Sequence, residues 1–454
     1  MEFSPWDFFI DFGLAATLLM IGTVLRAKVP LIQKLFLPAS IIAGFLGLLL
    51  GPNGLNFLPF SDQIGTYPAI LIAFIFGAIP LTTTVINWKQ IKNRVGSMWA
   101  FSQNSMILMW GAGLLFAVLL INPFWSELNS GFGLILAAGF VGGHGTAAAV
   151  GDMFSKHGWE EATSLAMTSA TVGVLAAILI GVLFVKIGSS KGYASYLTSF
   201  KDLPNELRTG LIPPASRKNV KMDTISSMSV DPFAVHFALV IFVAMGGYYL
   251  SQWGEMLIPA ATIPAFSLAF IVGLIVQKIL RSTNADQYID SHVISRISGS
   301  ATDFLVTFGI ASISISVVLD YIVPLLLLLA FGVFIAFMFF AVISRQYFPD
   351  YWFERGIFSW GWTTGTVAMG IALLRIVDPD GKSKTLDDYG LAYIPIAPVE
   401  VLLVTFGPLL VIQGQAWTFI GITLLASFLI FFISYKNKWL TFGKDKSKNV
   451  NSSN

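Results

Sequence analysis

The sequence contains no cysteine, which excludes disulfide bonds and thiolate metal sites. Its four histidines are scattered, and none belongs to a zinc motif such as HExxH. Charge is also scarce, because 11% of the 454 residues are charged, against roughly 25% in soluble proteins. Hydrophobic residues make up 55% of the chain, more than a water-soluble fold of this kind could cover. The composition predicts a polytopic membrane protein rather than an enzyme, with no cofactor and no nucleic-acid partner.

The N-terminal stretch MEFSPWDFFIDF lacks the basic region that precedes the apolar core of a cleaved signal peptide. We therefore expect the first apolar run to stay in the membrane. A spanning helix needs about 20 mostly apolar residues. Eleven runs fit this requirement: residues 6–25, 36–55, 67–85, 95–121, 162–187, 233–250, 262–280, 297–317, 322–344, 389–412 and 416–435.

Two further apolar segments, residues 132–154 and 357–376, are rich in Gly, Ala and Thr, and each precedes the last full span of its half. The basic residues indicate how these segments enter the membrane, because cytoplasmic loops carry the excess of Lys and Arg. If both segments enter and leave on one side, every basic residue except Lys156 lies in the cytoplasm. If residues 132–154 crossed the membrane, the basic residues from Lys186 to Lys221 would move outside. The sequence therefore predicts two re-entrant hairpins.

The predicted fold is all-α, with two inverted five-helix repeats, each with a re-entrant hairpin before its last helix, and an extra C-terminal helix. The predicted units are residues 1–187, a cytoplasmic linker at 188–231, residues 232–413, and a final span with a polar tail at 414–454. The motif GTAA at 145–148 aligns with GTVA at 365–368, in support of the repeat. We expect a multi-pass inner-membrane protein with its N-terminus outside and its C-terminus in the cytoplasm.

Interrupted helices in inverted repeats form the midplane binding sites of many secondary transporters. The sequence predicts such breaks at GGHGT (142–146) and GWTTGT (361–366). Helix N-termini at a break suit a carboxylate, while freed carbonyls and threonine hydroxyls suit a small cation. The alternative is that glycine merely allows close helix packing. The candidate substrate-binding residues are Gly142, Gly143, His144, Gly145, Thr146, Gly361, Thr364, Gly365 and Thr366.

Polar residues inside spans are candidates for ion coupling, because burying them in a membrane is costly. They are Gln103, Asn104, Asp303 and Glu400. Each also has a structural alternative, either a paired or protonated carboxyl or an amide that joins two helices. His144 could bind a carboxylate or carry a proton. No Lys or Arg lies in the middle of a predicted span, so an anionic substrate would depend on backbone dipoles and neutral donors.

The stretch GGHGTAAA at 142–149 resembles the bacterial glutamate:sodium symporter family. LPAS at 37–40, the pair Gln103-Asn104, and the glycines at 361 and 365 support this resemblance over about residues 36–410. The resemblance implies hairpins that meet at a substrate site, coupling to sodium, a homodimer and an elevator-like movement. It also implies site roles for residues 142–146, for Gly361 and Gly365, and for Gln103 and Asn104.

The chain departs from this family in the span after the second hairpin. Where the family has an aspartate and an asparagine, this chain is apolar, near Leu403 and Phe406, while Glu400 is introduced. The eleventh span is also additional. We expect a symporter in the lipid bilayer that uses sodium to import glutamate or a related small carboxylate. The alternative is a proton-coupled or exchange transporter of another organic anion, working through Glu400 or His144.

Overall fold

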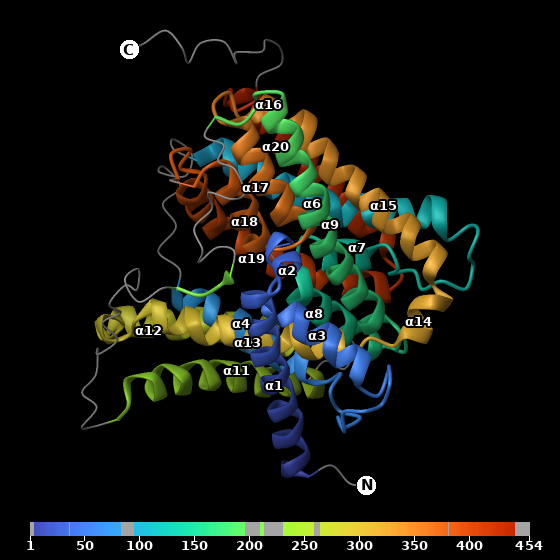
Figure 1. Ribbon diagram of the computed structural model, residues 1–454, viewed down its shortest axis with the longest axis vertical. Helices are drawn as coiled ribbons and strands as arrows, with labels where there is room; N and C mark the ends of the chain where they lie inside the picture. The colour runs from blue at the N-terminus through green and yellow to red at the C-terminus, as the bar shows by residue number, and fades with distance from the viewer. Residues whose placement is uncertain are drawn as a thin grey trace.

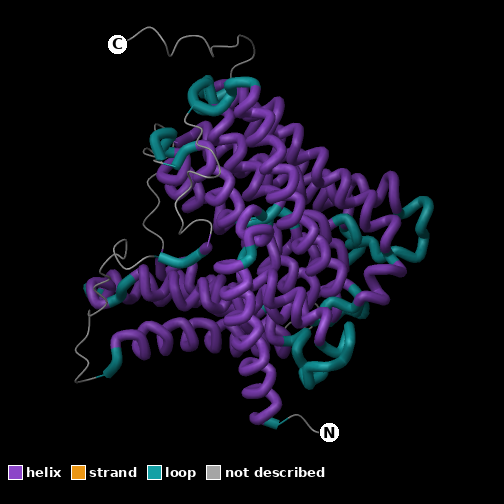
Figure 2. Tube along the Cα trace, in the orientation of Figure 1, coloured by secondary structure: helices purple, strands orange, loops and turns teal. Residues whose placement is uncertain are grey.

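The computed structural model describes residues 4–35, 37–82, 95–195, 209–212, 230–257, 264–379 and 381–440. Within these ranges the regular secondary structure is helical and no strand occurs (Figures 1 and 2). The all-α prediction is confirmed. Most of the predicted linker at 188–231 and the tail beyond residue 440 lie outside the described residues.

The described helices are distributed over the two halves of the chain as follows. The first half contains α1 (Pro5–Lys28), α2 (Pro30–Lys34), α3 (Ala39–Leu50), α4 (Tyr67–Thr82), α6 (Gly96–Phe116), α7 (Leu134–Gly139), α8 (Gly143–Ser155) and α9 (Ala162–Ser190). The second half contains α11 (Pro232–Leu257), α12 (Ala265–Ser282), α13 (Ser291–Ala311), α14 (Ile315–Asp320), α15 (Ile322–Met338), α16 (Ser344–Tyr347), α17 (Trp352–Thr364), α18 (Val367–Val377), α19 (Thr385–Ile412) and α20 (Ala416–Lys436).

Eight helices in the described ranges are long and apolar enough to cross a membrane, fewer than the eleven runs expected from the sequence. The shortfall lies in α3, α4 and α13. Pro38 and Gly51 confine α3 to 12 residues, a rise of about 18 Å against a hydrocarbon core of about 30 Å. Helix α4 has 16 residues up to the end of the described range. Helix α13 has 21 residues, but its serines, Arg296 and Asp303 lower its hydropathy.

The helices pack in two bundles (Figure 1). We call α6–α9, α15 and α17–α20 the hairpin bundle, and α1, α3, α4 and α11–α13 the side bundle. Helices α8 and α9 of the hairpin bundle pack against α4 and α13 of the side bundle. At this interface, a Cβ atom added to Gly145 would lie 2.8 Å from Cδ1 of Ile72. Both predicted hairpins, formed by α7 and α8 and by α17 and α18, belong to the hairpin bundle.

Each predicted hairpin turns back on itself. In the first, a Cβ atom on Gly131 would collide with the ring of Phe154, so the start and end of the segment are neighbours. In the second, a Cβ atom on Gly361 of α17 would lie 2.6 Å from the nitrogen of Gly370 of α18. Helices α17 and α18 therefore lie against each other on either side of the break. The inverted relation of the two halves stays a prediction.

Candidate functional site

The tips of the two hairpins meet inside the hairpin bundle. A Cβ atom on Gly143, at the start of α8, would lie 3.3 Å from Cγ2 of Thr366 and 3.4 Å from the carbonyl oxygen of Gly365. Gly143 and Thr366 stand at the N-terminal ends of α8 and α18, respectively. Segments from opposite halves of the sequence are thus brought into contact at the two predicted breaks.

The first tip depends on a backbone conformation that favours glycine. Gly142 donates its N–H to the carbonyl of Ala137 at 3.2 Å, and Gly143 then adopts φ +65°. In this left-handed region a side chain with a Cβ atom is strained. The side chain of Thr146 folds back over Gly142, where a Cβ atom would collide with it. The GGHGT motif therefore supplies the turn and the first residues of α8.

The second break falls at Gly365 and Thr366, at the end of the GWTTGT motif. The N–H of Gly365 donates to the carbonyl of Gly361 at 3.1 Å and ends α17. Thr366 is extended, and its hydroxyl oxygen accepts from the N–H of Met369 at 3.4 Å, so it caps α18. The hydroxyl of Thr364 donates to the carbonyl of Trp360 at 2.6 Å. Gly361 lies within α17 and provides its close approach to α18.

Helix α9 lies between the hairpins and contacts both. A Cβ atom on Gly139, at the end of α7, would lie 2.5 Å from the nitrogen of Ala170. On the other side, a Cβ atom on Gly173 would collide with the carbonyl oxygen of Thr364. The indole N–H of Trp360 in α17 also donates to the carbonyl of Ala177 at 3.1 Å. These small residues let α9 fix the position of each tip relative to the other.

His144, at the first tip, is 3% exposed, and its Nε2 lies 3.1 Å from the hydroxyl oxygen of Thr171 on α9. The hydroxyl of Thr171 donates its single hydrogen to the carbonyl of Met167 at 2.8 Å. The hydrogen between His144 and Thr171 must then come from the histidine, which assigns the tautomer protonated at Nε2. The ring is oriented by α9, and its Nδ1 is the atom left with acceptor capacity.

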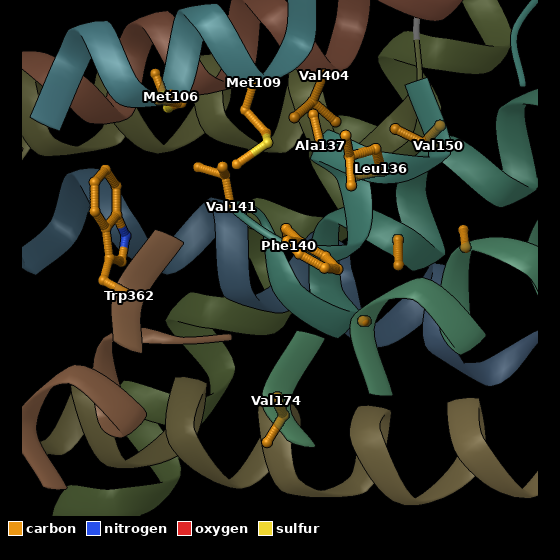
Figure 3. Packing of buried hydrophobic residues seen from close by; sticks show 14 of the residues in the cluster. Met106, Met109, Leu136, Ala137, Phe140, Val141, Val150, Val174, Trp362 and Val404 are labelled. Carbon is orange, nitrogen blue, oxygen red and sulfur yellow. The ribbon is translucent and has the colours of Figure 1, made fainter. Parts of the chain in front are cut away.

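Gln103 and Asn104 are buried in α6, but they differ in their partners. The side-chain oxygen of Asn104 accepts from the hydroxyl of Ser427 on α20 at 2.6 Å, which joins these two helices. Both polar atoms of the Gln103 side chain are buried without a hydrogen-bond partner. Farther along α6, Met109 points toward Val141 in the turn of the first hairpin (Figure 3). Because its polar side-chain atoms have no partner, Gln103 is the better candidate for a ligand contact, whereas Asn104 already has a structural partner in Ser427.

Glu400 is linked to the second hairpin through aromatic residues. Its Oε2 accepts a hydrogen bond at 2.9 Å from the hydroxyl of Tyr393, which lies on the same helix, α19. The ring of Tyr393 stacks on Tyr389 at 5.8 Å, and Tyr389 contacts the ring of Trp362 in α17 at 5.4 Å. Asp303 lies in the side bundle instead, where the Ser40 side chain hydrogen-bonds its carboxylate. The structure thus connects Glu400 to α17 of the second hairpin, whereas Asp303 belongs to α13 of the side bundle.

Neither tip carries a positive side chain, since residues 131–155 and 356–374 contain no Lys or Arg. The nearest arginines along α17 and α18 have partners at the helix ends. Arg355 donates to the carboxylate of Asp388 at 2.9 Å, and Arg375 donates to the carbonyl of Pro379 at 3.0 Å. Positive potential at the tips therefore comes from the N-terminal ends of α8 and α18.

The sequence profile of the sodium/glutamate symporter family matches residues 7–351. The chain belongs to this family. The match includes the first hairpin and α9, and it ends one residue before α17, so the second hairpin of this symporter lies beyond the matched range. A comparison with curated protein sequences returned no match. Family membership makes the protein a transporter and agrees with its many apolar helices.

Several residues that shape the site were missed by the sequence reasoning. Thr171 orients His144, and Tyr389 and Tyr393 connect Glu400 to α17. The row Gly173, Ala177 and Gly181 on α9 was recognisable from its spacing of four residues, which places small side chains on one face of a helix. The partner of that face could not be read from the spacing. Asp11 of α1 was not among the candidates either; it is fully buried and accepts hydrogen bonds from the Ser61 backbone N–H and hydroxyl and from the Tyr67 hydroxyl.

Proposed function

We propose that this symporter couples sodium to the import of glutamate or a related small carboxylate, and that the substrate binds where the two hairpin tips meet. The observation that carries the proposal is the contact of Gly143 with Gly365 and Thr366, because it brings two helix N-termini to one place. Membership in the sodium/glutamate symporter family supports the choice of substrate and ion.

A carboxylate between these tips would be held by backbone N–H groups and by the positive ends of α8 and α18. A helix end contributes roughly 0.3–1 kcal/mol to an exposed anion and up to about 2 kcal/mol when partly buried. Two such helix ends can bind an acidic solute although no arginine side chain lies at the tips. The carbonyl of Gly365 and the hydroxyl oxygens of Thr146 and Thr366 offer hard oxygen ligands for sodium.

Movement of the hairpin bundle past the side bundle would expose this site to each side of the membrane in turn. Contacts at the base of the second hairpin favour movement as one body. Glu354 accepts from the backbone N–H of Ser195 beyond α9 at 2.6 Å, and the neighbouring Arg355 is paired with Asp388 of α19. These bonds tie α17 to both adjacent segments. An elevator-like mechanism follows, because the two tips, α9 and α19 would travel together.

The membrane location, the orientation and the oligomeric state of the protein are part of the same proposal. We infer an inner-membrane protein with its N-terminus outside and its C-terminus in the cytoplasm, from the distribution of Lys and Arg along the sequence. The homodimer is inferred from the resemblance to the glutamate:sodium symporters.

A proton-coupled or exchange transporter of another organic anion is the second candidate, and one observation favours it. Glu400 is a carboxyl group within an apolar span, hydrogen-bonded to Tyr393 and connected through Tyr389 to α17. An intramembrane carboxyl of this kind is a common element of proton relays.

Transport by the purified protein in liposomes would test both candidates. Uptake of labelled glutamate is measured with an inward sodium gradient, with an inward proton gradient, and with neither. We expect saturable uptake that requires sodium and is competed by small dicarboxylates. Uptake driven by protons alone would replace the first candidate with the second. Flux that neither saturates nor couples to an ion would contradict both.

A further inference from the structure

A cavity of about 490 Å³ lies between the two bundles. Ala149, Asp152 and Lys156 line it from α8 of the hairpin bundle. Its other walls come from α4, α11 and α12 of the side bundle. This volume falls within the range of 300–1,000 Å³ that is typical of small-molecule sites. The cavity is distinct from the hairpin tips, because α8 contributes its last turns to it rather than its N-terminus.

The cavity is polar at one end and apolar at the other. The polar end carries the ion pair of Asp152 and Lys156, whose charged atoms are 2.8 Å apart, and Tyr248 of α11 also lines the cavity. Seven residues before Tyr248 on α11 lies Ile241, about 10 Å deeper along the helix. There the wall is formed with Phe74 of α4. The cavity therefore matches an amphiphilic molecule, which has a charged group at one end and an apolar part at the other.

The walls of the cavity reach the surface of the side bundle, in which α1, α11 and α12 are long and apolar enough to cross a membrane. Ile70 is 55% exposed, and Met245 and Tyr248 are about half exposed. Trp253, near the end of α11, is also exposed, and tryptophan is enriched beside lipid headgroups. Helix α11 is long and apolar enough to cross a membrane, where its exposed apolar side chains would contact acyl chains and the cavity would open to the bilayer.

A second cavity, of about 330 Å³, continues from the apolar end. It shares Ile70 and Phe74 with the first cavity and is otherwise lined mainly by aromatic rings of α1, α11 and α13. The ring of Phe237 of α11, which lines the second cavity, lies 6.4 Å from the ring of Phe74, which lines both. An occupant with a charged head at Lys156 can therefore extend its apolar part along α4.

We propose that this crevice binds one bilayer phospholipid with a zwitterionic headgroup that contains a primary ammonium, as in phosphatidylethanolamine. The phosphate would contact the ammonium of Lys156, which has three donors, and the headgroup ammonium would contact the carboxylate of Asp152, which has acceptor sites to spare. The pair need not separate, because each group keeps unused hydrogen-bonding capacity. One acyl chain lies against Ile70, Phe74 and Ile241.

Lipid binding by the purified full-length protein tests the inference without reference to transport. The protein is stripped of lipid in detergent and titrated with phosphatidylethanolamine or phosphatidylglycerol, and the bound lipid is counted by native mass spectrometry. Lys156→Gln removes the cation, Asp152→Asn removes the anion, and Ile241→Trp fills the apolar end. The matched control is Lys186→Gln, which removes an exposed lysine at the end of α9, outside both cavities.

We expect one phosphatidylethanolamine to bind preferentially to the native protein and to the control. Lys156→Gln should weaken this binding by about tenfold, the effect of losing a charge-assisted hydrogen bond. Asp152→Asn should abolish the preference over phosphatidylglycerol, and Ile241→Trp should reduce the binding of both lipids. Equal binding of the two lipids to the native protein would overturn the proposal. So would equal losses in Lys156→Gln and Lys186→Gln.

Discussion

Replacing Gly143 with alanine tests whether the meeting of the two tips forms the binding site. Gly143 has φ +65°, and a residue with a Cβ atom loses about 1–2 kcal/mol in the left-handed region. The added methyl group would lie 3.3 Å from Thr366 and 3.4 Å from Gly365, so the tips need to separate by only a few tenths of an ångström. Backbone strain, rather than collision, should therefore dominate the effect of the substitution.

The size of the effect on transport follows from this strain. If the tip relaxes out of its left-handed conformation, the N-terminus of α8 no longer faces α18. An energy of 1–2 kcal/mol changes a population by a factor of about 5–30. Because apparent affinity scales with the binding-competent fraction, we expect Gly143→Ala to raise the KM for substrate by up to about 30-fold. Transport at saturating substrate should change much less.

The assay is the concentration dependence of sodium-driven glutamate uptake in proteoliposomes, normalised to inserted protein. Gly192→Ala is the matched control, because Gly192 has φ +68° and no heavy atom within 4 Å of an added Cβ atom. It imposes the same strain at the end of α9, away from the tips. If both variants show the same KM, the tips do not form the substrate site and the reasoning from Gly143 is refuted.

Three further predictions concern polar groups within the helices. His144→Ala and Thr146→Ala should each weaken the apparent affinity for substrate or sodium while the protein stays inserted, as measured by uptake titrations; unchanged transport in both would exclude the first tip. Glu400→Gln should change the dependence of uptake on sodium and pH more than the choice of substrate, and native ion dependence in that variant would make Glu400 structural. Asp11→Asn, which weakens three hydrogen bonds to Ser61 and Tyr67, should lower the thermal unfolding midpoint in detergent. A cost of about 1–3 kcal/mol is expected for such a buried group, and an unchanged midpoint would contradict it.

The first hairpin was predictable because its signal is local. GGHGT combines a run of glycines with polar residues between apolar stretches, and Gly143 indeed provides the left-handed turn. The second break falls within its predicted motif as well, but the sequence does not distinguish the roles of its two glycines. Gly365 ends α17, whereas Gly361 packs against Gly370 inside the hairpin. A glycine needed for conformation and one needed for close packing look alike in a sequence.

The polar candidate residues also look alike in the sequence and are distinguished only by their packing. Gln103 and Asn104 are adjacent and chemically similar, and the sequence gives no reason to separate them. Successive residues of a helix point about 100° apart, so Asn104 faces Ser427 of α20 while Gln103 does not share this partner. Asp303 and Glu400 are likewise both acids within apolar spans, yet packing places Glu400 near α17 and Asp303 in the side bundle.

The sequence by itself determined that the protein is helical, belongs in a membrane and contains two interrupted segments. These properties depend on hydropathy, charge distribution and glycine content within windows of about 20 residues. Only the tertiary structure decided that the tips meet at Gly143 and Thr366, that α9 orients His144 through Thr171, and that a cavity opens between the bundles. Such contacts join residues far apart in the chain, and they depend on how whole helix faces fit together, which no local window records.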